Sequence, residues 1–231
     1  MELSKRLEAI ATCVNGPSLA DIGTDHAYLP IALCQRGIIQ KAIASDINNG
    51  PLQRAHENIA AQGLSAQIET RLGAGLSTIA PCDASCCVIA GMGGLLVLEI
   101  LANDMPTAKS FQTLVLQPQR DLPEVRRFLL ANGFVIQDEA MLVDGGKFYN
   151  ILTCIPRIEQ EAYTDTELFF GRHLLRKRDK TLADWLAREI TRVDTILTNM
   201  RRTASDAARL HELETWCIQC EEGLRWLQCG R

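Results

Sequence analysis

The first two thirds of the chain alternate short apolar runs with longer segments whose apolar positions recur every three or four residues. Short apolar runs are typical of buried parallel strands, and the longer pattern is typical of amphipathic helices. The pattern predicts strands at 19–22, 41–46, 68–73, 86–90 and 113–117. It predicts helices at 3–14, 27–36, 48–63, 95–102 and 123–131. The expected fold is therefore α/β with a mostly parallel sheet.

The alternation stops after Gly133, where two strand patterns follow one another with no helix between them. They cover residues 134–143 and 147–153 and flank Asp144-Gly145-Gly146, a sequence typical of a hairpin turn. Such a hairpin adds an antiparallel strand to the parallel sheet. We expect a mixed sheet that ends in this hairpin.

No strand pattern follows Pro156, so we place a domain boundary there, between residues 1–156 and 157–231. Thr164 and Glu167 have the spacing of a capping box, which predicts a helix start. Two apolar series then follow at alternating four- and three-residue steps, the first beginning at Leu182 and the second at Leu210. The polar residues 201–206 between them predict a chain reversal. The C-terminal domain should be a helical, coiled-coil-like hairpin.

Composition limits the class of protein. The 231 residues are 47% hydrophobic, enough for a sizeable core, and we find no apolar run of the roughly 18 residues that a membrane span needs. The first residues lead into a predicted helix rather than a signal peptide, so we expect a cytoplasmic protein whose nine cysteines are reduced. Cys217 and Cys220 fall on the apolar stripe of a predicted helix, which favours core packing over a metal site. No metal site is expected.

The first strand ends in a tight glycine turn, Asp21-Ile22-Gly23, and the second strand ends in Asp46. Glycine lets the backbone approach a ligand closely, and an acid at the second strand can accept both hydroxyls of a ribose. With the terminal hairpin, this arrangement resembles the S-adenosylmethionine (SAM) site of a Rossmann-like methyltransferase. The alternative is a sheet whose turn contains Asp and Gly for structural reasons alone.

The chain resembles the TrmK-type tRNA (adenine-N1)-methyltransferases in four motifs. These are residues 21–30, 90–94 and 116–119, and the hairpin that carries Lys147-Phe148-Tyr149. The resemblance covers residues 3–154 and extends to the helical tail. It implies methyl transfer from SAM to N1 of an adenine in tRNA, at position 22. The cofactor-binding residues that we expect are Asp21, Gly23, Asp46, Ile47, Gly73, Ala74, Gly91 and Met92.

The glycine-rich segment from Gly91 to Gly94 follows the fourth strand, at the sheet edge where ligands lie. We expect the substrate to be met by Gly93, Gly94, Gln117 and Pro118; a tight strand–helix turn is the alternative for the glycines. The Asn/Asp-Pro-Pro-aromatic motif that grips exocyclic amines is absent here, which favours a ring nitrogen such as N1.

Two positions depart from the family pattern. Ala74 stands where a polar residue that binds the SAM adenine amine is usual, and Gln119 stands where Asn is common. The first departure leaves backbone groups or stacking to hold the adenine.

Asp25, His26 and Tyr28 follow the same turn and are the candidate catalytic residues. Methylation of N1 leaves a positive charge on the base, which a nearby carboxylate can stabilise, or from which it can take a proton. The alternative for Asp25 is a helix cap at Ala27. His26 could contact the base or face solvent, and Tyr28 could stack on a flipped-out base or pack in the core.

The C-terminal region has a basic group that could bind RNA phosphates. Residues 1–156 hold 11 basic and 15 acidic side chains, whereas residues 157–231 hold 13 of each. The expected tRNA contacts are Arg172, Arg176, Lys177 and Arg178; a solvated helix face is the alternative.

Three functions remain open at this point: a tRNA adenine-N1 methyltransferase, a SAM-dependent methyltransferase of a small molecule or protein, and a SAM-binding RNA module without turnover. The basic tail favours RNA. We expect tRNA as the partner, no membrane association, and a monomer or weak homo-oligomer.

Overall fold

The computed structural model describes residues 2–202 and 206–230. The chain forms two compact units, Met1–Glu161 and Ala162–Arg231. The division follows Glu161 rather than Pro156, because the segment after the last strand remains with the first unit.

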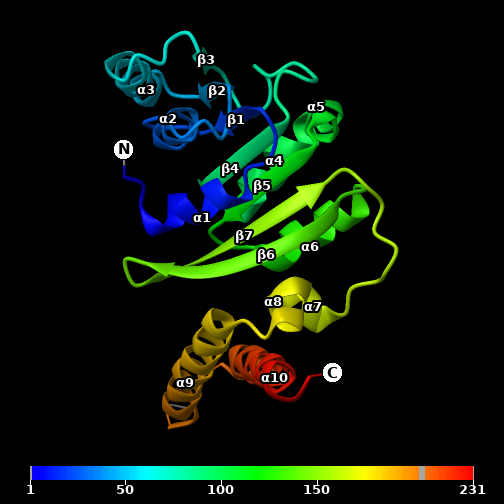
Figure 1. Ribbon diagram of the computed structural model, residues 1–231. Helices are drawn as coiled ribbons and strands as arrows, with labels where there is room; N and C mark the ends of the chain where they lie inside the picture. The colour runs from blue at the N-terminus through cyan, green and yellow to red at the C-terminus, as the bar shows by residue number, and fades with distance from the viewer. Residues whose placement is uncertain (1, 203–205, 231) are drawn as a thin grey trace. The chain divides into compact units, whose positions relative to one another are not determined.

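The first unit is built on a seven-stranded sheet in the order β3-β2-β1-β4-β5-β7-β6 (Figure 1). The strands from β1 to β5 pair in parallel, while β7 runs antiparallel to both β5 and β6. The predicted mixed sheet and its terminal hairpin are confirmed. The strands are β1 (Ser18–Ile22), β2 (Lys41–Asp46), β3 (Ile68–Leu72), β4 (Cys86–Met92), β5 (Thr113–Pro118), β6 (Val135–Asp144) and β7 (Lys147–Ile155).

Three helices share one hydrophobic cluster with the sheet: α1 (Lys5–Cys13), α2 (Tyr28–Gln35) and α3 (Asn49–Ala61). Two others, α4 (Gly94–Asn103) and α6 (Leu122–Ala131), pack against each other. A short helix, α5 (Met105–Ser110), lies outside the predicted elements. It is too short for a periodic pattern and begins at a local signal, because Asp104 Oδ1 accepts a hydrogen bond from Thr107 N–H at 3.1 Å.

The sheet has a topological switch point between β1 and β4. From β1 the chain continues outward through β2 to β3, whereas β4 and β5 extend in the other direction. In sheets of this type, ligands bind at the carboxyl ends of the strands beside the switch point. The order of the strands therefore places the expected site next to Gly23 and Gly91.

The second unit is wholly helical in its described residues: α7 (Asp165–Phe170), α8 (Arg172–Lys177), α9 (Lys180–Arg202) and α10 (Ala207–Cys229). The capping box is confirmed, since Thr164 Oγ1 accepts from Glu167 N–H and Glu167 Oε2 accepts from Thr164 N–H. The helices α9 and α10 pack antiparallel: Arg201 near the end of α9 pairs with Glu214, and Leu186 near its start lies beside Gly223.

The buried stripes of α9 and α10 follow the predicted step only in part. In α9, Leu197 is buried, whereas Ile196 and Met200 of the apolar series are partly buried. In α10, Gly223 is buried and Leu224 only partly so. Cys217 and Cys220 are buried as free thiols, as core packing requires. Within the predicted reversal, residues 203–205 lie outside the described part of the chain. None of the helices in the described part is both long and apolar enough to cross a membrane.

Candidate active site

A cavity of about 670 Å³ lies at the carboxyl ends of β1, β2, β3 and β4. This volume is in the range that small-molecule sites occupy. Its wall includes most of the predicted cofactor residues: Gly23, Asp46, Ile47, Gly73, Ala74, Gly91 and Met92. Sequence positions far apart therefore meet at one site, where the switch point of the sheet places them.

Asp46 is the acid of this cavity. It ends β2, is buried, and its Oδ1 accepts a hydrogen bond from Asn48 N–H at 2.8 Å. That bond fixes the carboxylate at the edge of the strand. Ile47 beside it is 65% exposed and lines the same cavity, so it offers an apolar surface against which a planar ring can stack.

Gly23 has a positive φ of 74°, a backbone conformation that side chains other than glycine rarely adopt. Its N–H donates to Ser45 O at 2.8 Å, which ties the turn to β2. A Cβ built at this position would overlap the methyl group of Met92. Glycine is thus required by the turn, whereas the Met92 methyl group, at the end of a flexible side chain, could move aside.

Asp21 is not part of the cavity wall in this structure. Its carboxylate is buried and accepts a hydrogen bond from Thr24 Oγ1 at 2.6 Å. Burial raises its pKa to about 6, although the Thr24 hydrogen bond and the charge of Arg6 act in the opposite direction. Asp21 therefore lies behind the cofactor turn, bonded to Thr24, and its predicted role in cofactor binding stays a prediction.

The glycine-rich segment is positioned by two glutamines of β5 and its following loop. Gly91, at φ 79°, donates its N–H to Gln117 Oε1 at 3.2 Å, and its carbonyl accepts from Gln119 Nε2 at 2.9 Å. Arg6 Nη1 donates to the same Gln117 Oε1 at 3.0 Å. The Gly91 peptide is held on both sides, and the unusual Gln119 has a clear structural role.

Three of the four residues predicted to meet the substrate in this region are buried, and their contacts with a substrate stay a prediction. Gln117 and Pro118 are buried in the sheet, and Gly94 is buried against the loop that follows β5. A Cβ on Gly94 would overlap the backbone oxygen of Arg120. The alternative interpretation, a tight strand–helix turn, holds for Gly94. Gly93, the N-cap residue of α4, remains partly exposed.

Asp25, His26 and Tyr28 form a group beyond the Gly23 turn, in which Asp25 and Tyr28 are exposed and His26 is partly buried. The rings of His26 and Tyr28 stack with centroids 5.1 Å apart and an interplanar angle of 14°. Asp25 Oδ2 lies 3.5 Å from His26 Nε2, and the Asp25 side chain is 61% exposed. The arrangement puts a carboxylate beside a two-ring stack on the surface.

The structure bears on the structural alternatives for Asp25 and Tyr28. The helix α2 begins at Tyr28, and its N-cap residue Ala27 has a left-handed conformation without a side-chain cap bond. Asp25 is therefore not a helix cap. Tyr28 is 41% exposed, which excludes a purely core role. Asn58 Nδ2 donates to the backbone oxygen of His26 at 3.0 Å and helps to fix this loop.

The basic group of the second unit is only partly as predicted. Arg172 is buried, with its side chain 4% exposed, and it pairs with Glu167 at 3.1 Å. Its guanidinium also lies 3.6 Å from the centroid of the Tyr163 ring. Arg172 cannot contact a phosphate in this position, so that prediction is wrong. Arg176, Lys177 and Arg178 are exposed, and Arg178 ends α8 in a left-handed conformation.

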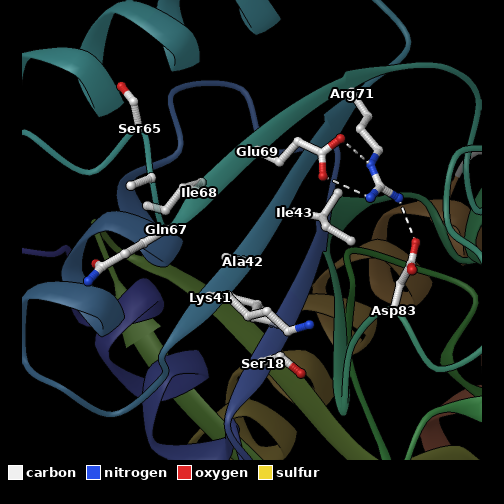
Figure 2. Close-up of a pocket in the computed structure, with 12 residues that line it drawn as sticks. Ser18, Lys41, Ala42, Ile43, Ser65, Gln67, Ile68, Glu69, Arg71 and Asp83 are labelled. Atoms are coloured by element: carbon white, nitrogen blue, oxygen red, sulfur yellow. Dashed lines mark hydrogen bonds and ion pairs between the residues drawn. The ribbon is translucent and has the colours of Figure 1, made fainter.

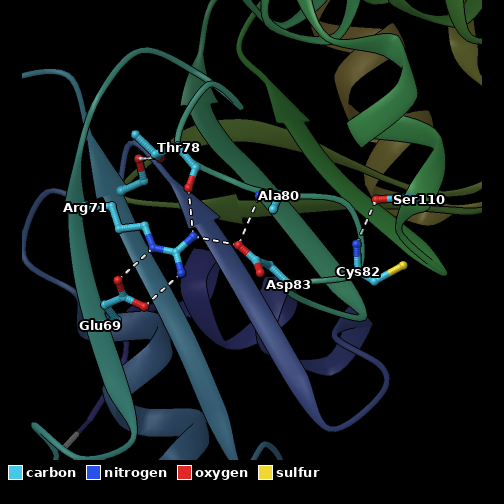
Figure 3. Close-up of polar contacts among 8 residues, drawn as sticks. Glu69, Arg71, Thr78, Ala80, Cys82, Asp83 and Ser110 are labelled. Carbon is cyan, nitrogen blue, oxygen red and sulfur yellow. Dashed lines mark hydrogen bonds and ion pairs between the residues drawn. The ribbon is translucent and has the colours of Figure 1, made fainter.

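A second, smaller cavity of about 220 Å³ lies near the amino-terminal ends of β1, β2 and β3 (Figure 2). Its polar wall is closed by Arg71, which pairs with Glu69 at 2.8 Å and with Asp83 at 2.6 Å. Figure 3 shows that Arg71 also donates to the backbone oxygen of Thr78, so its charge is fully used in tying the 78–83 loop to β3. The cavity lies at the strand ends opposite to those where ligands bind, and its cation is already paired, so we interpret it as a structural feature.

Sequence reasoning missed one wall of the main cavity, which consists of Leu96, Glu99, Ile100 and Asn103 of α4. Their helical spacing was a usable signal, but α4 is so apolar that this face cannot be distinguished from a core face. Arg6 was missed because its partners are more than one hundred residues away. Within residues 2–202 and 206–230, no cluster of three or more His, Cys, Asp or Glu side chains could hold a metal ion.

Comparison with known proteins identifies the family. Residues 19–222 match the TrmK family, described as tRNA (adenine(22)-N(1))-methyltransferase. The tRNA (adenine(22)-N(1))-methyltransferase of Bacillus subtilis is 35% identical over 74% of this chain and 72% of its own length.

Solved structures agree with this match. The crystal structure of the B. subtilis m1A22 tRNA methyltransferase TrmK superposes with a TM-score of 0.85 at 28% identity, covering 96% of this chain and 99% of that one. Streptococcus pneumoniae Sp1610, solved in complex with SAM, gives a TM-score of 0.87 at 32% identity and covers 96% and 100% of the two chains. The resemblance seen in the sequence motifs is confirmed, and this chain belongs to the TrmK family of tRNA (adenine(22)-N(1))-methyltransferases.

Proposed function

We propose that this protein transfers a methyl group from SAM to N1 of adenine 22 in tRNA. The observation that carries the proposal is the cavity at the four strand ends, with Asp46 and Gly23 in its wall, in a chain of this family. A small-molecule or protein methyltransferase would share the cavity but would have no need of the exposed cations of the second unit.

The cavity suits SAM in its chemistry. Asp46 has a second carboxylate oxygen available for a ribose hydroxyl, since Oδ1 already accepts from Asn48. The backbone at Gly23 and Gly91 presents no side chain, which leaves room for the methionyl portion of the ligand. SAM supplies an electrophilic methyl group on a positively charged sulfur.

The group next to the cofactor turn suits the base. The stacked rings of His26 and Tyr28 offer a π surface for an unstacked adenine. When N1 accepts the methyl group, the neutral ring becomes cationic, and the carboxylate of Asp25 can stabilise that charge or accept a proton from the amino group. We assign Asp25 as the catalytic carboxylate, with His26 and Tyr28 as base-binding residues.

The second unit suits the tRNA backbone. Arg176, Lys177 and Arg178 are consecutive exposed cations that can neutralise phosphates. We place the protein in the cytoplasm, where its substrate is found, as a monomer or weak homo-oligomer.

A methylation assay tests the function directly. The purified protein is incubated with methyl-labelled SAM and a tRNA transcript that carries adenine at position 22, followed by digestion to nucleosides. We expect labelled 1-methyladenosine, and none from a transcript with guanine at that position. Label in N6-methyladenosine, equal labelling of both transcripts, or no transfer at all would contradict the proposal.

A single substitution tests the role of Asp25. We expect Asp25→Ala to lower the single-turnover rate roughly 100-fold or more, while SAM affinity stays within a few-fold. Glu57→Ala serves as the control, because it removes an exposed carboxylate of α3 in the same unit, outside the cavity. A near wild-type rate in Asp25→Ala would show that the carboxylate is not catalytic.

A further inference from the structure

The α4 wall of the main cavity is not apolar throughout. Leu96, Ile100 and Asn103 recur at the spacing of one helix face, and Glu99 lies beside them one turn before Asn103. All four residues line the cavity. The last turns of an otherwise apolar helix therefore present a carboxylate and an amide to the space where the cofactor would lie.

These two side chains are free to bind a ligand. Among the described residues, neither Glu99 nor Asn103 makes a side-chain hydrogen bond or ion pair, and both residues are exposed. The neighbouring acid of the same wall, Asp104, is already occupied in capping α5. Asp104 therefore has a structural role as a helix cap, whereas the side chains of Glu99 and Asn103 have no structural hydrogen bond among the described residues.

The same cavity is lined by Ala74, whose methyl group cannot hydrogen-bond an adenine amine. The two walls are close: a Cβ built on Gly75 would lie 3.1 Å from Ile100 Cγ2. Ile100 precedes Asn103 by one helical turn and follows Glu99 directly. Gly75 follows Ala74 directly, so the loop that carries Ala74 and the helix that carries Glu99 and Asn103 are neighbours in the wall of one cavity.

We propose that Glu99 and Asn103 recognise the amino edge of the SAM adenine, in place of a polar side chain at position 74. This inference rests on the proposed function, because it takes the cavity to be the SAM site. An asparagine amide can accept a hydrogen bond from the adenine amine and donate to a ring nitrogen. A carboxylate accepts from the second amine hydrogen.

Binding of product analogues tests the assignment without turnover. Calorimetry measures S-adenosylhomocysteine and its analogue in which hydrogen replaces the adenine amino group. Wild-type protein should prefer the amino compound roughly tenfold or more, as expected for one or two hydrogen bonds, one of them to a charged acceptor. The ratio should fall below about threefold in the Glu99→Ala/Asn103→Ala variant. Glu57→Ala, which removes an exposed carboxylate of α3 outside the cavity, should keep the wild-type ratio.

The outcomes separate this inference from the proposed function. If the preference for the amino compound is unchanged in the double variant, backbone groups bind the amine. If wild-type protein shows no preference, no group binds it. Either result overturns the inference while leaving the SAM site intact. If wild-type protein binds neither compound, the SAM site itself is wrong and both proposals fail. Thermal unfolding confirms that each variant is folded before its affinity is measured.

Discussion

The buried carboxylate of Asp21 should make stability depend on pH in an unusual direction. Burial raises its pKa from the ordinary 3.8 to about 6 in the folded protein. The folded state then binds the proton more tightly than the unfolded state. The resulting stabilisation is complete below pH 3.8 and is lost as the pH rises through about 6.

The magnitude follows from the pKa difference. Each unit corresponds to about 1.4 kcal/mol, so the full contribution is about 3 kcal/mol. Between pH 7.5 and pH 5, where the folded group is mostly protonated and the unfolded group is still ionised, about 1.4 kcal/mol of it should appear. Most carboxylates in proteins act in the opposite sense, because ion pairs lower their pKa.

Urea unfolding of wild-type and Asp21→Asn protein at pH 5, 6 and 7.5 measures this contribution. Asparagine can still accept the hydrogen bond from Thr24 but does not titrate, and all other groups cancel in the comparison. The stability of the variant relative to wild type should therefore improve by about 1.4 kcal/mol from pH 5 to pH 7.5. A difference that does not change with pH would refute the reasoning.

Asp83→Asn provides a control without pH dependence in this range. The hydrogen bond from Arg71 is the main cause of a lowered pKa at Asp83, so its contribution is lost only as the pH falls below 3.8. Between pH 5 and pH 7.5 the stability difference between Asp83→Asn and wild type should therefore stay constant, in contrast to that of Asp21→Asn.

Two further predictions concern the cavity. Asp46→Ala should weaken SAM binding by roughly ten- to a hundredfold in calorimetry, because one or two charge-assisted hydrogen bonds are worth about 1.5–3 kcal/mol each; unchanged affinity would remove Asp46 from the site. Gln117→Leu should slow methyl transfer at least tenfold, because it releases the Gly91 N–H and Arg6, whereas Gln117→Glu keeps an acceptor for both and should retain most of the rate. Equal rates in the two variants would contradict a positioning role for Gln117.

The sequence could predict the sheet because each of its signals is local. A wholly apolar β4 has to lie in the middle of the sheet, and Asp144-Gly145-Gly146 has to turn. The ends of the strands then bring Gly23 and Asp46 to one cavity through topology alone. This explains why cofactor residues at strand ends could be named before the structure.

The sequence predicted less well which side chains of a helix or turn are buried. Gln117 belongs to a motif of the family, yet its amide faces Gly91 and Arg6 inside the protein rather than a substrate. The cavity wall on α4 was not predicted, because Glu99 and Asn103 have the pattern of ordinary surface positions at the end of an apolar helix. Both outcomes depend on contacts between segments that a local pattern does not contain.

Arg172 and Arg176 illustrate the same limit and allow a final prediction. They are four residues apart in one basic group, but Arg172 is buried against Glu167 and the Tyr163 ring, whereas Arg176 is exposed. Arg172→Ala leaves the buried carboxylate of Glu167 without its partner, which should destabilise the protein by about 3–5 kcal/mol. Arg176→Ala should change stability by less than about 0.5 kcal/mol.

For tRNA binding, we expect the larger effect from Arg176→Ala and the smaller one from Arg172→Ala. Loss of one phosphate contact in Arg176→Ala should lower the salt slope of tRNA binding by about 0.7–0.9, with SAM affinity unchanged. Urea unfolding and filter binding at several salt concentrations separate the two effects. If Arg172→Ala were as stable as wild type and yet had a reduced salt slope, its guanidinium would have to reach the phosphates, and the buried ion pair with Glu167 could not be its role.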